Sequence, residues 1–332
     1  MKKIRSSLLF VMILTLTMII AACGNAGNED VAGDEGGNSG GEKQNLSLLT
    51  GGTGGTYYPL GGQIGKIISD NTDANITPQT SGASAENMET LRAGEAEIAF
   101  SQTDIAAYAI EGKEMFEGKP IDNIQAIGSI YPETVQLVTT KKSGIKSVED
   151  LKGKSVSVGA PGSGAYINAM QILEIYGLTK EDIKAQNLSF DESTDGIQSG
   201  NIDAAFVTAG TPTGAVEALS AQNDVVIIPI ADDKIDALIK QYPHYSKETV
   251  AAGTYNIEAD VNTVAVKAML VVTNDLKEDL VYEMTKALYE NTDKITHAKG
   301  EFITPETALQ GLGDMELHPG AAKYFEEKGI TE

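Results

Sequence analysis

Two well-separated stretches of this sequence repeat the same order of residue types. Residues 91–100 read LRAGEAEIAF, and residues 197–206 read IQSGNIDAAF. Each reads as a helix end, a glycine that stops the helix, an acidic residue, and an apolar strand ending in Ala-Phe. A Gly-rich strand-to-helix turn precedes each stretch, at Gly54 and at Gly162. The repetition predicts two lobes of like α/β topology, and the alternative is coincidence between two ordinary helix-to-strand junctions.

Short apolar runs alternate with helical patterns along the rest of the chain, which favours an α/β architecture. We expect strands at 46–49, 76–80, 98–101, 124–131, 135–140, 155–159, 188–190, 204–208, 225–229 and 264–272. We expect helices at 57–69, 83–93, 166–176, 194–199 and 280–291. A further helix should start at Pro212, and Pro132 should form a turn between two strands. The body from Asn45 to Glu332 is long enough for two lobes.

The first 22 residues have the anatomy of a secretory signal peptide. A basic start precedes an uncharged run over 8–22, which is shorter than the roughly 20 residues that a spanning helix needs. The run leads into Ile-Ala-Ala-Cys at 20–23, which resembles the lipobox of bacterial lipoproteins. We therefore expect removal of residues 1–22 and lipidation of Cys23, for example with palmitate. The alternative is an ordinary signal peptide followed by an incidental cysteine.

The segment after Cys23 has almost nothing to bury. Residues 24–42 read GNAGNEDVAGDEGGNSGGE, and a Gly-rich, polar segment of this kind cannot offset the entropy lost on ordering. We therefore expect a lipidated, flexible tether over residues 23–44. Cys23 is the only cysteine in the chain, so no intrachain disulfide is possible and the fold must depend on its own core.

The acidic balance of the chain excludes several partners. Loss of Lys2, Lys3 and Arg5 with the signal peptide takes the net charge from −22 to −25. Phosphate backbones and anionic headgroups repel such a body, so we expect no nucleic-acid partner.

The residue patterns that usually carry catalysis are missing from the sequence. His244, His297 and His318 are far apart and lack the spacing of metal ligands. No cysteine nucleophile follows Cys23, and no Gly-x-Ser-x-Gly elbow occurs. We expect neither a metal nor a cofactor, and we expect that the protein is not an enzyme.

The densest candidate site is the turn TGGTGGTYYPLG at residues 50–61, between a strand and a helix. Glycines let the backbone approach a ligand closely, and a helix N-terminus offers N–H groups to an anion. The turn GAPGSGAY at 159–166 repeats the arrangement. Two such turns facing each other would hold a small anionic or zwitterionic ligand. The alternative for the first is a tight turn without a ligand.

A third polar cluster, TSGASAEN at residues 80–87, also opens a helix after a strand. Its serines, Ser81 and Ser84, are candidates for ligand contacts or for simple N-caps. Segments 101–103, 131–134 and 208–212 occupy comparable strand ends.

Several of these motifs occur in an order that resembles a known family. TGGTGGTYYPLGG, SGASAEN, AEIAFSQ, SIYPE, VSVGAPGSGA and IDAAFVTAGTP look like the TAXI-type solute-binding proteins of tripartite ATP-independent periplasmic (TRAP) transporters. The resemblance covers nearly the whole body, and the first motif is the most specific. It implies a type II periplasmic-binding-protein fold: two α/β lobes with a hinge and a ligand cleft between them. Lobe 1 would comprise 45–135 plus 251–332, and lobe 2 would comprise 136–250.

The resemblance also implies a set of ligand-binding residues. Carried over by motif, they are Gly52, Thr53, Thr56, Tyr57, Ser81, Ser84, Asn87 and Gln102 in lobe 1, Tyr131 and Glu133 near the hinge, and Gly162, Ser163, Tyr166, Thr208 and Thr211 in lobe 2.

The ligand class is narrowed by a departure from many binding proteins. Family members are linked with glutamate, glutamine or related dicarboxylates, and many binding proteins clamp a carboxylate with an arginine. Here the only arginine of the mature chain, Arg92, precedes a helix-ending glycine away from the expected cleft. Anion recognition must therefore use backbone N–H groups and hydroxyls, with a lysine as a further candidate. This favours an amino-acid-like or monocarboxylate ligand over a strong dianion.

We therefore expect an extracytoplasmic solute receptor that closes its two lobes on a small carboxylate or amino acid. Its partner would be a TRAP transporter membrane subunit, which uses an ion gradient. The alternatives are a ligand-sensing domain with a signalling partner, or an enzyme built on a binding-protein scaffold. An unanchored receptor would diffuse away from a cell without an outer membrane. The lipid therefore favours anchoring to the cell membrane at a Gram-positive-type surface.

Overall fold

The computed structural model describes residues 43–331 and joins the strands of this body in one mixed sheet. The order along the sheet is β2-β1-β3-β10-β4-β7-β5-β6, with β8 also pairing with β4 and β9 with β10. The predicted signal peptide, Cys23 and most of the tether lie outside the described residues. Among residues 43–331, none of the helices is both long and apolar enough to cross a bilayer.

The bounds of the elements follow the expected α/β alternation. The strands are β1 Gln44–Leu49, β2 Ala74–Gln79, β3 Ile98–Gln102, β4 Ile124–Thr140, β5 Ser155–Ser157, β6 Lys184–Gln186, β7 Ala204–Ala209, β8 Val225–Ile228, β9 Ser246–Val250 and β10 Val261–Thr273. The helices are α1 Tyr57–Asn71, α2 Ser84–Arg92, α3 Thr103–Glu111, α4 Gly164–Ile175, α5 Phe190–Ser199, α6 Gly214–Ser220, α7 Asp232–Gln241, α8 Glu278–Tyr289 and α9 Pro319–Glu327.

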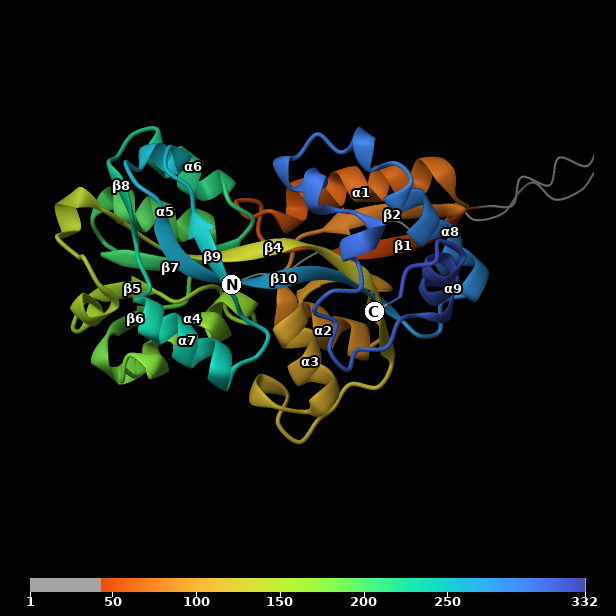
Figure 1. The fold of residues 1–332 in the computed structure, drawn as a ribbon, viewed down its shortest axis with the longest axis horizontal. Coiled ribbons are helices and arrows are strands. Elements are labelled where there is room, and N and C mark those ends of the chain that lie inside the picture. Colours follow the sequence, from red (N-terminus) through yellow and green to blue (C-terminus); the bar gives the residue numbers. More distant parts are fainter. Residues whose placement is uncertain (1–42, 332) are drawn as a thin grey trace, which may run out of the picture. The chain divides into compact units, whose positions relative to one another are not determined.

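Two long strands, β4 and β10, connect the two halves of the sheet (Figure 1). They pair antiparallel from Thr273 opposite Ile124 to Ala265 opposite Thr134. Parallel strands β1, β2 and β3 extend the sheet beyond β10, and parallel strands β5, β6 and β7 extend it beyond β4. The expected turn at Pro132 is wrong, because β4 continues through this residue. Pro132 lies opposite Lys267, next to a register shift in β10. A proline without an N–H is tolerated at such an irregularity.

The apolar side chains form separate cores on the two sides of these strands, so the body consists of two α/β lobes. The first core joins β1, β2 and β3 with α1, α2, α8 and α9. A second core joins β5, β7 and β8 with α4 and α7. A third core joins β7 and β8 with α5 and α6. The lobe boundaries remain a prediction. Val264 and Val266 pack with the second lobe, which supports a second boundary near residue 266 in place of 251.

Other expectations about single elements were wrong. Residues 188–190 do not form a strand, since β6 ends at Gln186 and α5 begins at Phe190. A capping box explains this early start: Ser189 Oγ accepts from the N–H of Glu192, and Glu192 accepts from the N–H of Ser189. The helix expected at Pro212 begins instead at Gly214, after a cis Thr211–Pro212 bond. The sequence patterns did not indicate α3, α7, α9, β6 or β9.

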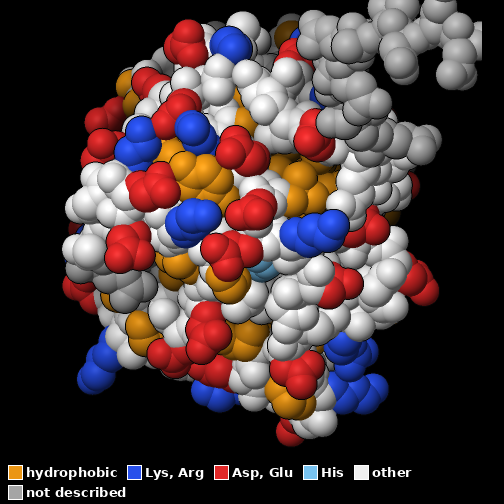
Figure 2. Space-filling view, turned by 90° about the vertical axis from the view of Figure 1, so that its right-hand side faces the viewer, with side chains coloured by type: hydrophobic (Ala, Val, Ile, Leu, Met, Phe, Trp, Pro, Cys, Tyr) orange, Lys and Arg blue, Asp and Glu red, His pale blue; other side chains and the backbone are white. Residues whose placement is uncertain are grey.

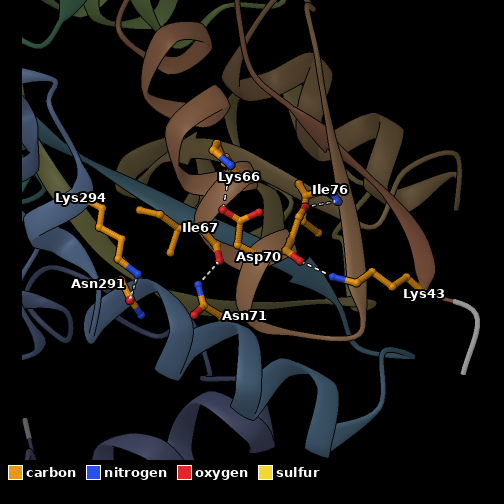
Figure 3. Close-up of polar contacts among 9 residues, drawn as sticks. Lys43, Lys66, Ile67, Asp70, Asn71, Ile76, Asn291 and Lys294 are labelled. Atoms are coloured by element: carbon orange, nitrogen blue, oxygen red, sulfur yellow. Dashed lines mark hydrogen bonds and ion pairs between the residues drawn. The ribbon is translucent and has the colours of Figure 1, made fainter. Parts of the chain in front are cut away.

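The start of the described chain is fixed to the first lobe by polar contacts (Figure 3). Lys43 donates to the carbonyl of Ser69 near the end of α1, and Ser69 Oγ accepts from the N–H of Ile76 in β2. Lys66 and Asp70 form an ion pair one helical turn apart, and the hydrogen bond from Lys66 lowers the pKa of the Asp70 carboxyl. Figure 2 shows acidic and basic side chains interspersed on one face, with small groups of hydrophobic side chains between them.

Candidate functional site

A cavity lies where strand ends and helix starts of the two lobes converge. The centre of a water-sized molecule can move through a volume of about 40 Å³ inside this cavity. The cavity therefore suits only a small ligand. It borders the turn after β1, the starts of α2, α4 and α5, the ends of β3 and β7, and the middle of β4. The lining residues are Gly51, Gly52, Gly55, Thr56, Tyr57, Ala83, Ser84, Gln102, Tyr131, Glu133, Ser163, Gly164, Ala165, Phe190, Thr208 and Ala209.

Most of the ligand-binding residues predicted from sequence line this cavity. The structure brings together Gly52, Thr56, Tyr57, Ser84, Gln102, Tyr131, Glu133, Ser163 and Thr208. Thr53, Ser81, Asn87, Gly162, Tyr166 and Thr211 are not among the lining residues. The role of all the predicted residues as ligand contacts, inside and outside this lining, stays a prediction.

Two of the residues outside the lining join the lobes directly. Gly162 O of lobe 2 accepts hydrogen bonds from the N–H groups of Ala85 and Glu86 in the first turn of α2, both at 3.0 Å. Thr53 Oγ1 of lobe 1 donates to Asp191 Oδ2 of lobe 2 at 3.2 Å. These contacts close the lobes over the cavity.

Asn87 and Ser81 organise the strand ends behind the cavity. Asn87 Nδ2 donates to Thr50 O at 2.7 Å and to Phe100 O at 2.8 Å, which ties the end of β1 to β3. Ser81 Oγ donates to Asn87 Oδ1 at 2.6 Å. Tyr166 donates its N–H to the N-cap Ser163 Oγ, and Thr211 Oγ1 is buried without a hydrogen-bond partner among the described residues.

Replacing Asn87 with alanine should destabilise the protein by about 1–3 kcal/mol, because the buried carbonyls of Thr50 and Phe100 would lose the amide donor, while Ser81 Oγ could still donate to Thr50 O. Solute affinity of the folded variant should change less than about threefold, since Asn87 does not line the cavity. Urea denaturation and ligand titration of the same preparation measure both quantities. Unchanged stability together with lost affinity would contradict this structural role.

Among the lining residues that the structure describes, Glu133 is the only carboxylate, and it is almost fully buried. Gln102 Nε2 donates to its Oε2 at 2.8 Å, and the Tyr131 hydroxyl donates to its Oε1 at 3.1 Å. Burial raises the pKa of Glu133 to about 8, and hydrogen bonds from Gln102, Tyr57 and Tyr131 reduce the rise only in part. At neutral pH the carboxyl of the ligand-free protein is therefore largely protonated.

The two cavity tyrosines surround this carboxyl. The Tyr57 ring stacks on Phe100 with centroids 4.7 Å apart, and its hydroxyl lies 3.4 Å from Ser84 Oγ. Burial and, after it, the proximity of Glu133 raise the pKa of both Tyr57 and Tyr131 well above the ordinary value. Both hydroxyls therefore stay protonated and act as donors towards the carboxyl group.

Two polar atoms in the cavity have no partner among residues 43–331. Gln102 Oε1 and Thr208 Oγ1 are buried and make no hydrogen bond there. Gln102 ends β3 in lobe 1, and Thr208 lies near the end of β7 in lobe 2. A buried polar atom without a partner costs about 1–3 kcal/mol. A ligand that bonded both atoms would recover this cost and bridge the lobes.

The positive potential of the cavity comes from helix starts. The described lining contains no lysine, arginine or histidine. Helix α1 begins at Tyr57 and α4 at Gly164, and both residues face the cavity. The N–H groups of a first helical turn have no intrahelical acceptor and carry the positive end of the helix dipole. The cavity therefore offers N–H donors to an anionic group and Glu133 to a cationic one.

The sequence analysis missed part of the lining. Gly51, Gly55, Ala83, Gly164, Ala165, Phe190 and Ala209 also border the cavity. Most of them neighbour predicted residues within the same motifs. Phe190 is different, and the capping box from Ser189 to Glu192 is the signal that could have located it, because it fixes the start of α5.

Within residues 43–331, no three side chains of the metal-ligating types gather at one place. His244, His297 and His318 are each half-buried or more, and burial lowers the pKa of all three imidazoles. His318 Nδ1 accepts from the N–H of Gly320 at the start of α9, so this histidine caps a helix.

Comparison with known proteins gives a family and a fold. A family model described as the NMT1-like family matches residues 48–329. A protein from Bordetella bronchiseptica RB50 is 16% identical, with 86% of this chain and 83% of that chain covered, at a TM-score of 0.52. PhnD1 from Prochlorococcus marinus (MIT 9301), in complex with methylphosphonate, is 13% identical, with 86% and 97% covered, at a TM-score of 0.52.

A putative L-cystine ABC transporter from Listeria monocytogenes is 17% identical, with 80% of this chain and 98% of that chain covered, at a TM-score of 0.48. At such identities the likeness concerns the fold alone. The Bordetella and Prochlorococcus structures agree with the type II periplasmic-binding-protein fold expected from the sequence motifs.

Proposed function

The chain belongs to the NMT1-like family, and from this membership we propose that it is an extracytoplasmic receptor that binds a small solute between its lobes and delivers it to a membrane transporter. The observation that carries the proposal is the cavity between the lobes, where two buried polar atoms, Gln102 Oε1 and Thr208 Oγ1, one from each lobe, have no partner among the described residues. A solute that satisfies both atoms binds the closed form better than the open form, and it therefore drives closure. Such a protein works by binding and release, without catalysis.

The proposed solute is a small molecule with both a carboxylate and a protonated amino group, as in an amino acid. The first-turn N–H groups of α1 and α4 suit the carboxylate. Glu133 suits the amino group, because a buried carboxylate becomes stable in its charged form when a cation lies against it. PhnD1 was solved with methylphosphonate, which is an anion. Here an anion alone would meet a carboxyl group and no cationic side chain in the lining.

The experiment that tests this function uses the purified full-length chain. Native mass spectrometry should detect a small molecule retained from the cells that produced it. Amino acids should then raise the melting temperature in proportion to the logarithm of their concentration, by mass action. Failure of every amino acid and small carboxylate to shift the melting temperature of a ligand-free preparation would refute the proposed solute class.

The proposed partner is the membrane subunit of a TRAP transporter. The order of motifs from TGGTGGTYYPLGG to IDAAFVTAGTP supports it, and an ATP-driven transporter is the alternative. The two can be separated in membrane vesicles that contain the candidate membrane subunit and the loaded receptor. Uptake that requires an ion gradient and persists without ATP supports the TRAP partner, and uptake that requires ATP refutes it.

Replacing Cys23 with serine tests the proposed lipid anchor. The variant should move from the membrane fraction into the medium, because it can no longer be acylated at this position. Its solute affinity should remain within about twofold of the unchanged protein, since the anchor precedes the folded body in sequence. Immunoblots of cell fractions and calorimetry of the released protein provide the measurements. Retention of the variant in the membrane would contradict an anchor at Cys23.

A further inference from the structure

Two lysines of this acidic protein, Lys267 and Lys299, have pKa values that burial lowers. Lysines 66, 113, 141, 152, 247, 323 and 328 each pair with a carboxylate. Lys267 and Lys299 form no ion pair with any acidic side chain in the described body, although both are at least half-buried. Lys299 is only 7% exposed. Glu248 and Glu301 attract the Lys299 ammonium group without forming an ion pair with it, whereas among the described residues no carboxylate does so for Lys267.

Lys267 lines a second cavity next to the strands that connect the lobes, and Lys299 contacts Phe302, another lining residue of this cavity. The centre of a water-sized molecule can move through a volume of about 190 Å³ inside this cavity. Its lining consists of Ser129, Ile130, Tyr131, Pro132, Lys267, Phe302, Thr307 and Gln310. Lys267 Nζ donates to Gln310 Oε1 at 2.7 Å, and Lys299 Nζ lies 4.6 Å from the centroid of the Phe302 ring.

The partners of these ammonium groups satisfy them only in part. An amide oxygen fills one of the three donor positions of Lys267, and the face of an aromatic ring attracts Lys299 without neutralising its charge. Burying an ammonium group without an opposite charge is costly. Accordingly, burial lowers the pKa of both lysines. An anion in the cavity would remove much of this cost. The hydroxyl groups of Ser129 and Thr307 also line the cavity, but both donate to backbone carbonyls, so Lys267 is the donor that an anion would meet.

We propose that this second cavity binds a small oxyanion, with Lys267 as its direct contact and Lys299 adding positive potential from behind Phe302. The shared chemistry is a compact group of negatively charged oxygens, as in inorganic phosphate or a short carboxylate. The site is separate from the solute cavity between the lobes and does not rest on the solute proposed there.

The position of the anion site links it to lobe movement. Its walls include Ser129–Pro132 of β4 and Lys267 of β10, the two strands that join the lobes. Tyr131 borders both this cavity and the solute cavity. Lys299 also packs on the second lobe, because a Cβ added to Gly210 would lie 2.8 Å from Lys299 Cγ. Opening of the lobes would therefore change the surroundings of both lysines.

Calorimetric titration of the full-length chain with sodium phosphate, and separately with sodium acetate, tests the proposal. Ionic strength is held constant with sodium chloride. At least one of the two anions should give a saturable isotherm, and Lys267→Met should weaken its binding about tenfold or more, as expected for loss of a charge-assisted contact. Lys152→Met removes the same charge from an exposed ion pair with Asp182 in lobe 2, and it should leave anion binding within twofold.

The outcomes distinguish a specific anion site at Lys267 from non-specific attraction of anions to any lysine. Absence of saturable binding by both anions to the folded protein overturns the proposal, as does equal weakening by the two variants. A circular dichroism melt verifies that each variant is folded. If Lys267→Met does not fold, Lys267→Gln takes its place, because it keeps a hydrogen-bond donor for Gln310 and lacks the charge. Unchanged anion binding by Lys267→Gln would also refute the site, whatever solute the cleft proves to bind.

Discussion

Replacing Glu133 with glutamine should weaken amino-acid binding about a hundredfold at pH 8. The variant keeps the size of the side chain, but it cannot supply the negative charge that pairs with the ammonium group of the solute. Removing one partner of a buried, hydrogen-bonded charge pair costs about 2–5 kcal/mol of binding free energy. Isothermal titration calorimetry of the full-length chain measures the change. Lys152→Gln, a substitution at an exposed ion pair, provides the matched control and should bind normally.

The same residue predicts how solute binding depends on pH. The pKa of Glu133 is about 8 in the ligand-free protein, so only about one carboxyl in a hundred is ionised at pH 6. Because the ammonium group needs the ionised form, affinity should rise about tenfold per unit from pH 6 towards pH 8, and then level off. Proton release on binding should accompany this rise. A flat profile, or an equal slope in Glu133→Gln, would contradict pairing of Glu133 with a cation.

The stability of the ligand-free protein should show the opposite trend. The folded-state pKa of Glu133, about 8, lies above the ordinary value of 4.5, so the folded state keeps a proton that the unfolded state loses. The contribution of Glu133 to the free energy of unfolding is complete below the pKa that this carboxyl has in the unfolded chain. It is lost as the pH rises through the pKa of the folded state. Asp104, whose pKa burial raises to about 6, acts in the same direction. Glu133→Gln should make the decline shallower without abolishing it.

Replacing Gly164 with alanine should weaken solute binding about tenfold or more while leaving the fold stable. Gly164 is the first residue of α4 in lobe 2, and it faces Gln102 of lobe 1. An added Cβ would overlap Gln102 Oε1, and it would lie 2.5 Å from Gln102 Cδ and 3.0 Å from Ile105 Cγ1. Overpacking of this kind costs about 1–3 kcal/mol. The cost arises only when the lobes meet, so it should reduce closure.

Gly62→Ala is the matched control for this substitution. Gly62 lies in α1, and a Cβ there would meet nothing within 4 Å. Alanine at such a helical position should stabilise the protein by about 0.4–1 kcal/mol and leave binding unchanged. Small-angle X-ray scattering with and without solute should show that Gly164→Ala stays more open than the control. A variant that closes and binds normally would mean that Gln102 can move aside without loss.

The local part of the site could be predicted from the sequence because its signals are short-range. Glycines between a strand and a helix require a turn and expose helix N–H groups, wherever the lobes later meet. Accordingly, the cavity is lined by the predicted segments around Gly52, Ser84, Gln102 and Ser163. Glu133 also lines the cavity. It was predicted because the whole motif SIYPE resembles a motif of the family, although the continuous strand through Pro132 was not predicted.

The remaining features depend on contacts between residues far apart in the chain. Asn87 carries the same polar side chain whether it faces a ligand or the ends of β1 and β3, and only the packed structure shows that it bonds Thr50 O and Phe100 O. Lys299 gave no signal, because its distinction is that it is buried and forms no ion pair among the described residues. Its contact with Gly210 joins segments from the two lobes. Neither composition nor periodicity contains such information.

The order of strands has a consequence for biosynthesis. β10 lies between β3 and β4 in the sheet, yet it is the last strand of the described chain to be made. Until residue 273 has left the ribosome, the sheet of lobe 1 lacks a central member, and its apolar faces cannot be completed. Domains generally fold as units during synthesis, once their parts are available. This arrangement delays completion of lobe 1, and the delay would suit the secretion expected from the first 22 residues, because a chain must be unfolded to pass through a secretion channel.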